Sequence, residues 1–240
     1  MKKLGQPNNL TDQALNLIRQ SIMSGELEAG RQYSAAQLAE RLGVSRTPVR
    51  EALLQLSSAG MVAMMKNRGV QVLSTSIDDL LDGFQVRLML EVPAAAHAAT
   101  IRGDAEIERV STAFTALHKA AARNSTEDTL RADRDFHLEL VRVTGNSRIV
   151  SILKDLRNVV LLRGVGTVPL SRTCQETADD HNDIFESFLH QDGPGAAKAM
   201  RRHILNTARL LIRQEAQSRQ EFAIDNLGER LSWPNDVLMK

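Results

Sequence analysis

Residues 34–56 read SAAQLAERLGVSRTPVREALLQL and predict two short helices joined by a tight turn. Ser34 with Gln37 three residues later is a capping-box start for the first helix, and Gly43 permits the turn that ends it. In the second helix, apolar residues recur at the spacing of one buried face; they are Val49, Ala52, Leu53 and Leu56. The two helices are therefore expected to share a core on one side and to face solvent on the other.

The solvent side of the second helix is basic near its N-terminal end, where Arg46, Thr47 and Arg50 lie. Pro48 costs little there, because first-turn amides have no partner within a helix. A helix-turn-helix needs this arrangement, since its second helix enters the major groove of DNA by the N-terminal end. The alternative interpretation is an ordinary helix pair whose arginines only face water.

A β-hairpin is predicted directly after these helices. Gly60–Met65 and Val70–Leu73 have the pattern of strands, and Lys66–Gly69 between them is a basic turn that ends in glycine. A hairpin in this place is typical of a winged helix-turn-helix. An apolar stripe over Leu10–Ile22 predicts one more helix before the pair, and residues 26–33 have the composition of a connection.

These residues carry a family resemblance. The run LAERLGVSRTPVREALLQLSSAGMV, followed by NRGVQV, resembles the winged helix-turn-helix of the GntR family of bacterial transcriptional regulators. The resemblance implies that Arg46 and Arg50 read bases and that the Arg68–Gly69 step enters the minor groove. The full set of residues expected at the DNA is Ser34, Ser45, Arg46, Thr47, Arg50, Arg68 and Gly69, with Ser45 and Thr47 on the backbone. Several relatives have arginine where this chain has Ala36, so its operator preference is expected to differ.

Composition bounds the class of protein. The 240 residues are enough for two modest domains, and 42% hydrophobic with 25% charged residues is typical of a globular chain. Cys174 is the only cysteine, and no apolar segment has the length of a membrane span, so we expect a cytoplasmic protein with no membrane partner. Residues 1–75 contain nine Lys or Arg against five Asp or Glu, whereas the remainder contains 21 against 24. The basic part is the part predicted to bind DNA.

Residues 76–220 are expected to form an all-α helical bundle, after a polar junction at 74–76. Six helices are predicted, over residues 77–101, 104–122, 125–144, 146–162, 173–190 and from 193 to about 219. The fold class is therefore mainly α, a winged helix-turn-helix followed by a bundle. Residues 221–240 are expected to be a tail, which docks through Trp233 or stays mobile.

Four residues of the bundle bear donor atoms for a metal ion. Asp133 and His137 have the i, i+4 spacing of one helix face, and His181 and His203 lie among apolar residues of later helices. A buried imidazole or carboxylate needs a partner, and a shared cation would be one for all four. Taken singly, each histidine is more often an ordinary core or surface residue; His97, His118 and His190 are left unassigned.

The set of four resembles the FCD family of ligand-sensing domains, which has an Asp-x-x-x-His pair and two later histidines. The resemblance implies a metal at Asp133, His137, His181 and His203. Three imidazoles and one carboxylate suit zinc or nickel rather than calcium. A metal-dependent hydrolase is the alternative function, but the sequence has no separate general-base or nucleophile motif, and a hydrolase would not explain the DNA-binding part.

Arg87 and Glu91, one helical turn apart, form a second candidate site. Either Arg87 clamps the carboxylate of an effector, or the two residues form a surface ion pair of little worth. We expect the protein to bind a palindromic double-stranded operator as a homodimer, because one recognition helix covers too few base pairs. A small organic acid at the metal would release it from a repressed promoter; activation stays open as the alternative.

Overall fold

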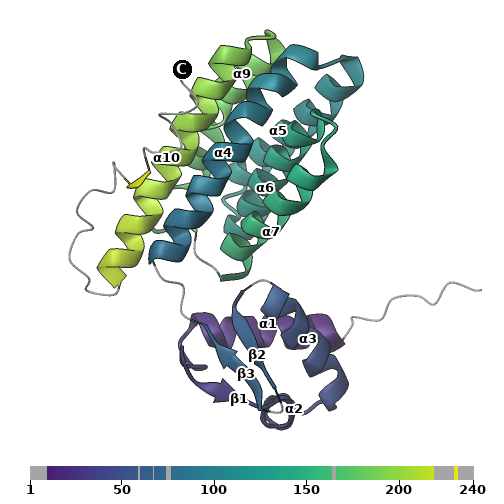
Figure 1. The fold of residues 1–240 in the computed structure, drawn as a ribbon, viewed down its shortest axis with the longest axis vertical. Helices are drawn as coiled ribbons and strands as arrows, with labels where there is room; N and C mark the ends of the chain where they lie inside the picture. The colour runs from purple at the N-terminus through teal and green to yellow at the C-terminus, as the bar shows by residue number, and fades with distance from the viewer. Residues whose placement is uncertain are drawn as a thin grey trace, which may run out of the picture. The chain divides into compact units, whose positions relative to one another are not determined.

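The computed structural model describes residues 10–58, 60–66, 68–73, 77–163, 166–218 and 230–231. The chain forms two compact units that are divided in the sequence between residues 75 and 76, with residues 158–164 grouped with the first unit. Figure 1 labels the helices and strands of each unit. The predicted junction at 74–76 lies outside the described residues, as does Trp233.

The first unit has a three-helix core. It contains α1 (Leu10–Met23), α2 (Ala35–Leu42) and α3 (Arg46–Ser58). The capping box that begins α2 is present: the Ser34 hydroxyl accepts a hydrogen bond from the backbone of Gln37 at 3.1 Å, and the Gln37 side chain accepts one from the backbone of Ser34 at 2.9 Å. Gly43 ends α2 in the left-handed conformation, at φ +66°. The predicted helix, turn and helix are confirmed in this part of the chain.

A small antiparallel sheet completes the first unit. β2 (Val62–Met65) and β3 (Gly69–Val72) are the predicted hairpin, and β1 (Gln32–Tyr33) pairs with the other edge of β3. The prediction of a simple connection over residues 26–33 was wrong at β1, because two residues are too few for a visible alternation. Gly69 is required where β1 meets β3: at φ +93°, a Cβ on it would lie 2.2 Å from the carbonyl oxygen of Tyr33.

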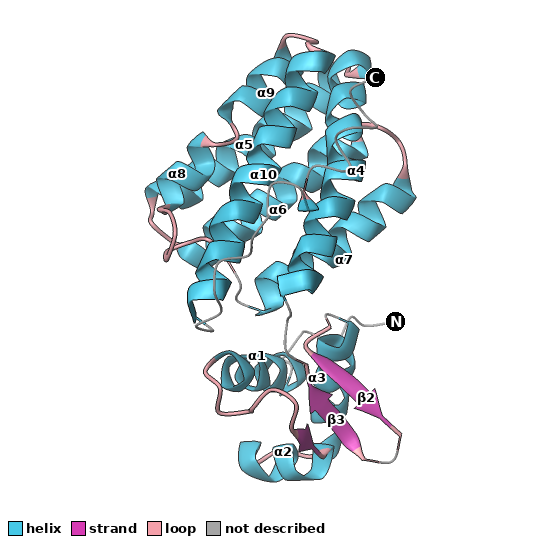
Figure 2. Ribbon diagram, turned by 60° about the vertical axis from the view of Figure 1, so that its left-hand side comes forward, coloured by secondary structure: helices cyan, strands magenta, loops and turns pink. Residues whose placement is uncertain are grey.

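Helices are the only regular secondary structure in the described residues of the second unit, which confirms the predicted bundle (Figure 2). Its helices are α4 (Ile77–Ile101), α5 (Asp104–Ala122), α6 (Thr126–Arg142), α7 (Ser147–Arg163), α8 (Cys174–Asp179), α9 (Asn182–Leu189) and α10 (Gly193–Ser218). α4 packs against α6, α9 and α10, and the buried side chains of these helices form the main core of the unit. Among the described residues, no helix is both long enough and apolar enough to cross a bilayer.

One predicted helix is in fact two. The capping box of Thr173 and Glu176 begins α8 as expected, but the helix ends at Asp179 and α9 begins at Asn182. The two residues between them, Asp180 and His181, make the joint. The sequence did not show the break, because the apolar spacing continues across it. In the structure, the side chains of Asp180 and His181 at the break reach different partners.

α4 and α10 run side by side (Figure 1). They approach closely at the start of α10, where a Cβ on Gly193 would lie 2.9 Å from Cγ2 of Thr100 and 3.1 Å from the carbonyl oxygen of Ala96. Leu231, from the expected tail, is buried in the same core as α4.

Candidate functional site

The N-terminal end of α3 exposes the side chains predicted to contact DNA. Ser45, Arg46, Thr47 and Arg50 are all exposed, whereas the Pro48–Val49 step between them is buried in the core of the first unit. The buried residues fix the helix, so that its polar tip is presented to solvent. An α-helix with such a tip has the shape and charge to enter a major groove.

The other residues predicted at the DNA are placed less simply. Arg68 is exposed in the turn just before β3. Gly69 is half-buried against β1, and Ser34 is half-buried and caps α2. Ser34 and Gly69 thus have structural roles inside the unit, whatever they contact outside it.

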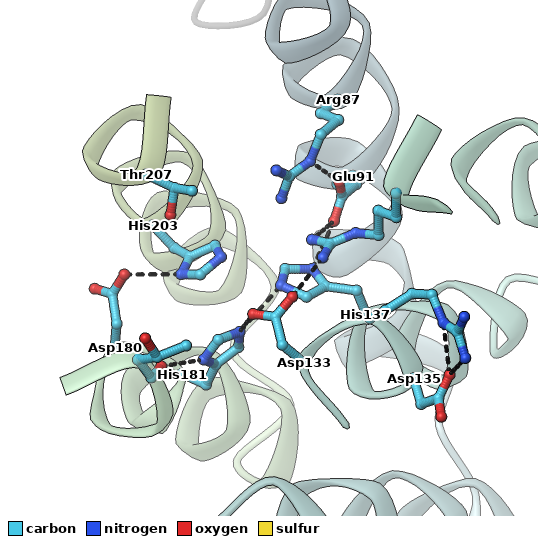
Figure 3. A network of polar contacts seen from close by, with 12 residues as sticks. Arg87, Glu91, Asp133, Asp135, His137, Asp180, His181, His203 and Thr207 are labelled. Atoms are coloured by element: carbon cyan, nitrogen blue, oxygen red, sulfur yellow. Dashed lines mark hydrogen bonds and ion pairs between the residues drawn. The ribbon is translucent and has the colours of Figure 1, made fainter. Parts of the chain in front are cut away.

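The structure brings Asp133, His137, His181 and His203 together in the second unit (Figure 3). One donor atom from each lies within 4.8 Å of the others. Asp133 and His137 come from α6, His181 from the joint between α8 and α9, and His203 from α10. The three rings are buried and the Asp133 side chain is 16% exposed.

The ring nitrogens of His137 and His181 face each other. Their Nε2 atoms are 3.1 Å apart, and Oδ1 of Asp133 lies 3.1 Å from Nε2 of His181. On the far side of each ring there is an acceptor for a proton. Nδ1 of His181 donates to the carbonyl oxygen of Thr177 at 2.8 Å, and Nδ1 of His137 lies 2.5 Å from Oε2 of Glu91.

This arrangement fits a transition-metal ion. A neutral imidazole has one N–H and one lone pair, so a proton on Nδ1 leaves the lone pair on Nε2. The Nε2 lone pairs of His137 and His181 are 3.1 Å apart and repel one another, and the Asp133 oxygen brings a further lone pair close to them. An extra proton or a cation among these three atoms would remove the repulsion. Three imidazole nitrogens with one carboxylate oxygen are donors that zinc and nickel prefer.

His203 is held by a carboxylate that the sequence analysis did not select. Its Nδ1 donates to Oδ2 of Asp180 at 2.9 Å, and Nη1 of Arg172 donates to the same oxygen at 3.1 Å. Although burial alone would raise it, the hydrogen bond from His203 and the nearby Arg172 lower the pKa of Asp180 to about 2. Burial lowers the pKa of His203 to about 4. The contact is therefore one between a neutral ring and an ionised carboxylate at neutral pH.

Arg87 and Glu91 are not a surface pair, so that interpretation is wrong. Glu91 is 0% exposed and Arg87 6% exposed, with Nε of the arginine 2.6 Å from Oε1 of the glutamate. A second buried arginine, Arg157 on α7, forms ion pairs with both Glu91, at 2.9 Å, and Asp133, at 2.8 Å. Burial acts to raise the pKa of Glu91, but the two arginines hold it well below its ordinary value. Nη2 of Arg87 is buried and has no hydrogen-bond partner among the described residues.

Three residues of the site could not be recognised from the sequence: Arg157, Asp180 and Arg172. Arg157 is one of several arginines along its helix, and nothing in the spacing distinguishes it. Asp180 is adjacent to His181, and adjacent side chains of a continuous helix point about 100° apart. A helix that directs His181 toward the other donors would therefore direct Asp180 elsewhere, and its contact with His203 could not be predicted. Only the break between α8 and α9 makes that contact possible.

Family models match both units. A model described as bacterial regulatory proteins, gntR family, matches residues 10–72, and one described as FCD domain matches residues 82–206.

Similar proteins are transcription regulators by name. The HTH-type transcriptional regulator LutR of Bacillus subtilis (strain 168) is 28% identical over 211 residues, covering 79% of this chain and 95% of that protein. The HTH-type transcriptional repressor RspR of Escherichia coli (strain K12) is 24% identical over 212 residues, covering 88% and 92%. An uncharacterized HTH-type regulator in the TAR-I ttuE-ttuC' intergenic region of Agrobacterium vitis is 32% identical over 131 residues, covering 53% and 77%.

Solved structures share the fold. Escherichia coli McbR/YncC has a TM-score of 0.64 at 21% identity, with 86% of this chain and 98% of that one covered. Lar, which controls the expression of the Listeria monocytogenes agr system, has a TM-score of 0.63 at 20% identity, with 88% and 99% covered.

Proposed function

The chain belongs to the gntR family of bacterial regulatory proteins and carries an FCD domain, and on that premise we propose that it is a repressor released by a small organic acid. As a member of this family it is a DNA-binding transcription regulator. The relatives named above are all regulators, so the hydrolase alternative has no support. RspR is a repressor by name, which favours repression for this chain.

In this proposal, residues 1–75 bind one half of a palindromic operator, and a second copy of the chain binds the other half. Arg46 and Arg50 read base edges, Ser45 and Thr47 contact the backbone, and Arg68 reaches the minor groove. Exposure of these side chains on a helix tip fixed by Val49 supports the assignment. Homodimers suit palindromes because the two-fold axes coincide. A regulator of this kind acts on chromosomal DNA, and therefore in the bacterial cytoplasm.

Residues 76–220 hold the effector in this proposal. Asp133, His137, His181 and His203 would bind zinc or nickel through one oxygen and three nitrogens. Such an ion, when bound, would supply a positive centre that attracts a carboxylate. The convergence of the four donor atoms within 4.8 Å is the observation that carries the assignment.

Arg87 would bind the same acid through a charge-assisted hydrogen bond. Its buried Nη2, which lacks an acceptor among the described residues, supports this role. The donors and Arg87 come from α4, α6, α10 and the α8–α9 joint, so an acid that binds among them favours one arrangement of these helices. Operator binding then becomes weaker, and the loss in its free energy equals the coupling free energy between the effector site and the DNA-binding surface.

A mobility-shift titration of a palindromic fragment tests the proposal. The zinc-loaded protein should retard the fragment, and any organic acid that raises its melting temperature should also weaken the retardation. His181→Ala should still retard DNA but should hold less metal and lose the response to the acid. A protein that contains no stoichiometric metal and is unaffected by chelator would refute the metal site.

A further inference from the structure

We propose that Glu91 and Asp180 are positioning residues for the metal site: each holds one imidazole in the tautomer whose Nε2 lone pair faces the other donors. The inference rests on the proposed metal site and deepens it. Glu91 orients His137, and Asp180 orients His203. Neither carboxylate is a member of the donor set itself.

The tautomer decides whether a histidine can bind a metal at all. A neutral ring offers a lone pair on only one nitrogen, and a proton on that nitrogen blocks coordination. An acceptor behind the ring fixes the proton on the far nitrogen and makes the near one more basic. Ring orientation is fixed by the same hydrogen bond.

His203 shows the arrangement clearly (Figure 3). Its Nδ1 is 2.9 Å from Oδ2 of Asp180, while the ring centroid lies 4.4 Å from that of His181 and 5.0 Å from that of His137. The carboxylate therefore contacts the ring through Nδ1, and Nε2 is left for the metal. Arg172 completes the support, since it donates to Asp180 at 3.1 Å and to the Thr207 hydroxyl at 3.1 Å.

His137 has a related contact deeper in the unit, a short ion-pair contact whose angles are not those of a hydrogen bond. Oε2 of Glu91 lies 2.5 Å from Nδ1 of the ring, and the glutamate is itself 0% exposed. Arg87 and Arg157 contact the two oxygens of Glu91 at 2.6 and 2.9 Å. These arginines fix the carboxylate in place, so the direction of the His137 ring is set from α4 and α7.

The third ring serves as an internal comparison. Nδ1 of His181 donates to a backbone carbonyl, that of Thr177, at 2.8 Å. A side-chain substitution cannot remove that acceptor, whereas the acceptors behind His137 and His203 are carboxylates that can be replaced. The proposal thus concerns two of the three rings.

Asp180→Asn is the decisive variant, because the Asp180 side chain is partly exposed, at 17%, and the amide has nearly the same shape. An asparagine can keep a neutral carbonyl oxygen between Arg172 and Nδ1, but it lacks the negative charge, so the proton on Nδ1 is held less strongly. Asp183→Asn is the matched control: Asp183 is three residues away, is exposed and pairs with the exposed Arg202. Glu91→Gln is the second variant, for His137.

Zinc affinity of the full-length protein, measured by competition with a chromophoric chelator, is the first readout. Asp180→Asn should weaken zinc binding by about 10–100-fold, which is the usual cost of losing an outer-shell partner. Asp183→Asn should bind as the wild type does. The second readout is the proton position in zinc-free protein by ¹⁵N NMR, which six histidines make tractable. His203 should be protonated on Nδ1 in the wild type and partly on Nε2 in Asp180→Asn.

The outcomes separate the two claims. If the wild type binds zinc and Asp180→Asn binds it equally well, or if the His203 proton stays on Nδ1 in the variant, the positioning role is overturned while the metal site stands. If the wild type binds no zinc, the proposed metal site is wrong, and the positioning role falls with it.

Discussion

Arg46 and Arg50 lie one turn apart on the solvent side of α3, while Val49 between them is fully buried. The two arginines make no contribution to the core, so each can be removed without a cavity. The residues that pack α3 into the core are therefore different from those that face solvent, so the predicted DNA contacts can be tested by substituting single side chains.

Arg46→Ala and Arg50→Ala should each weaken operator binding by about 1–3 kcal/mol if the arginines contact bases. The thermal unfolding of both variants should match that of the wild type, because both residues are exposed. Fluorescence anisotropy with a labelled operator at fixed salt measures the loss. Arg109→Ala, which removes an exposed arginine from the second unit, is the control for net charge. An equal loss of operator affinity in this variant would contradict the assignment of Arg46 and Arg50 to base contacts.

His203 predicts a pH dependence of stability in the metal-free protein. Burial lowers the pKa of His203 to about 4, whereas the unfolded side chain titrates near about 6.5. At a pH between these two pKa values, His203 binds a proton in the unfolded chain but not in the folded chain. The free energy of unfolding should therefore fall as the pH decreases, by about 1–2 kcal/mol between roughly pH 6.5 and 5.

Urea unfolding in the presence of chelator measures this decrease. His203→Gln should show a correspondingly smaller fall over the same range, because glutamine does not titrate. A variant whose pH profile coincides with that of the wild type would show that His203 is not the group responsible.

The positions of the site residues were predictable only in part. Asp133 and His137 could be paired by their spacing, because four residues bring two side chains to one helix face. His181 and His203 were joined to them by resemblance, since no local pattern links residues on different helices. Glu91 and Asp180 gave no signal as partners of those rings, because the contacts depend on how α4 and the α8–α9 joint pack.

At the scale of elements, the continuous helices and the hairpin were predicted, whereas the two-residue strand β1 and the break between α8 and α9 were not. The prediction over residues 77–101 agrees with the bounds of α4, because a 25-residue helix repeats its apolar spacing many times. β1 has two residues and β2 and β3 four each, so their pairing depends on tertiary contacts more than on pattern. The break between α8 and α9 is likewise set by the partners of Asp180 and His181.

Gly69 is the residue on which the wing sheet depends. Gly69→Ala should destabilise the first unit by at least about 1 kcal/mol, because the backbone conformation is left-handed and the added carbon would overlap β1. Gly83→Ala on α4 is the contrasting control, since a Cβ there meets no atom within 4 Å. That change should stabilise the protein by about 0.5–1 kcal/mol through helix propensity. Chemical unfolding compares the two, and equal stability of both variants would contradict the close approach at β1.

At the scale of the whole molecule, the chain has two units with separate cores. The donor atoms all come from residues 133–203, within the second unit. A ligand that binds only the folded form stabilises the unit that holds it. The two units should therefore respond differently to metal.

Differential scanning calorimetry with and without zinc tests this difference. Zinc at about 100 times its dissociation constant should stabilise the second unit by about 2.7 kcal/mol and leave the transition of the first unit unchanged. Chelator should reverse the shift. An equal shift of both transitions, or of neither, would contradict a metal site confined to the second unit.

The close approach of Gly193 to Ala96 and Thr100 has a mechanical consequence. The backbones of α10 and α4 are in contact there, so that end of the pair cannot slide or spread without losing its packing. His203 lies ten residues along α10, about 15 Å from this contact, and Ser218 about 22 Å farther. A ligand that displaces His203 is then expected to tilt α10 about Gly193 as a pivot, and the displacement is amplified about 2.5-fold at the far end of the helix.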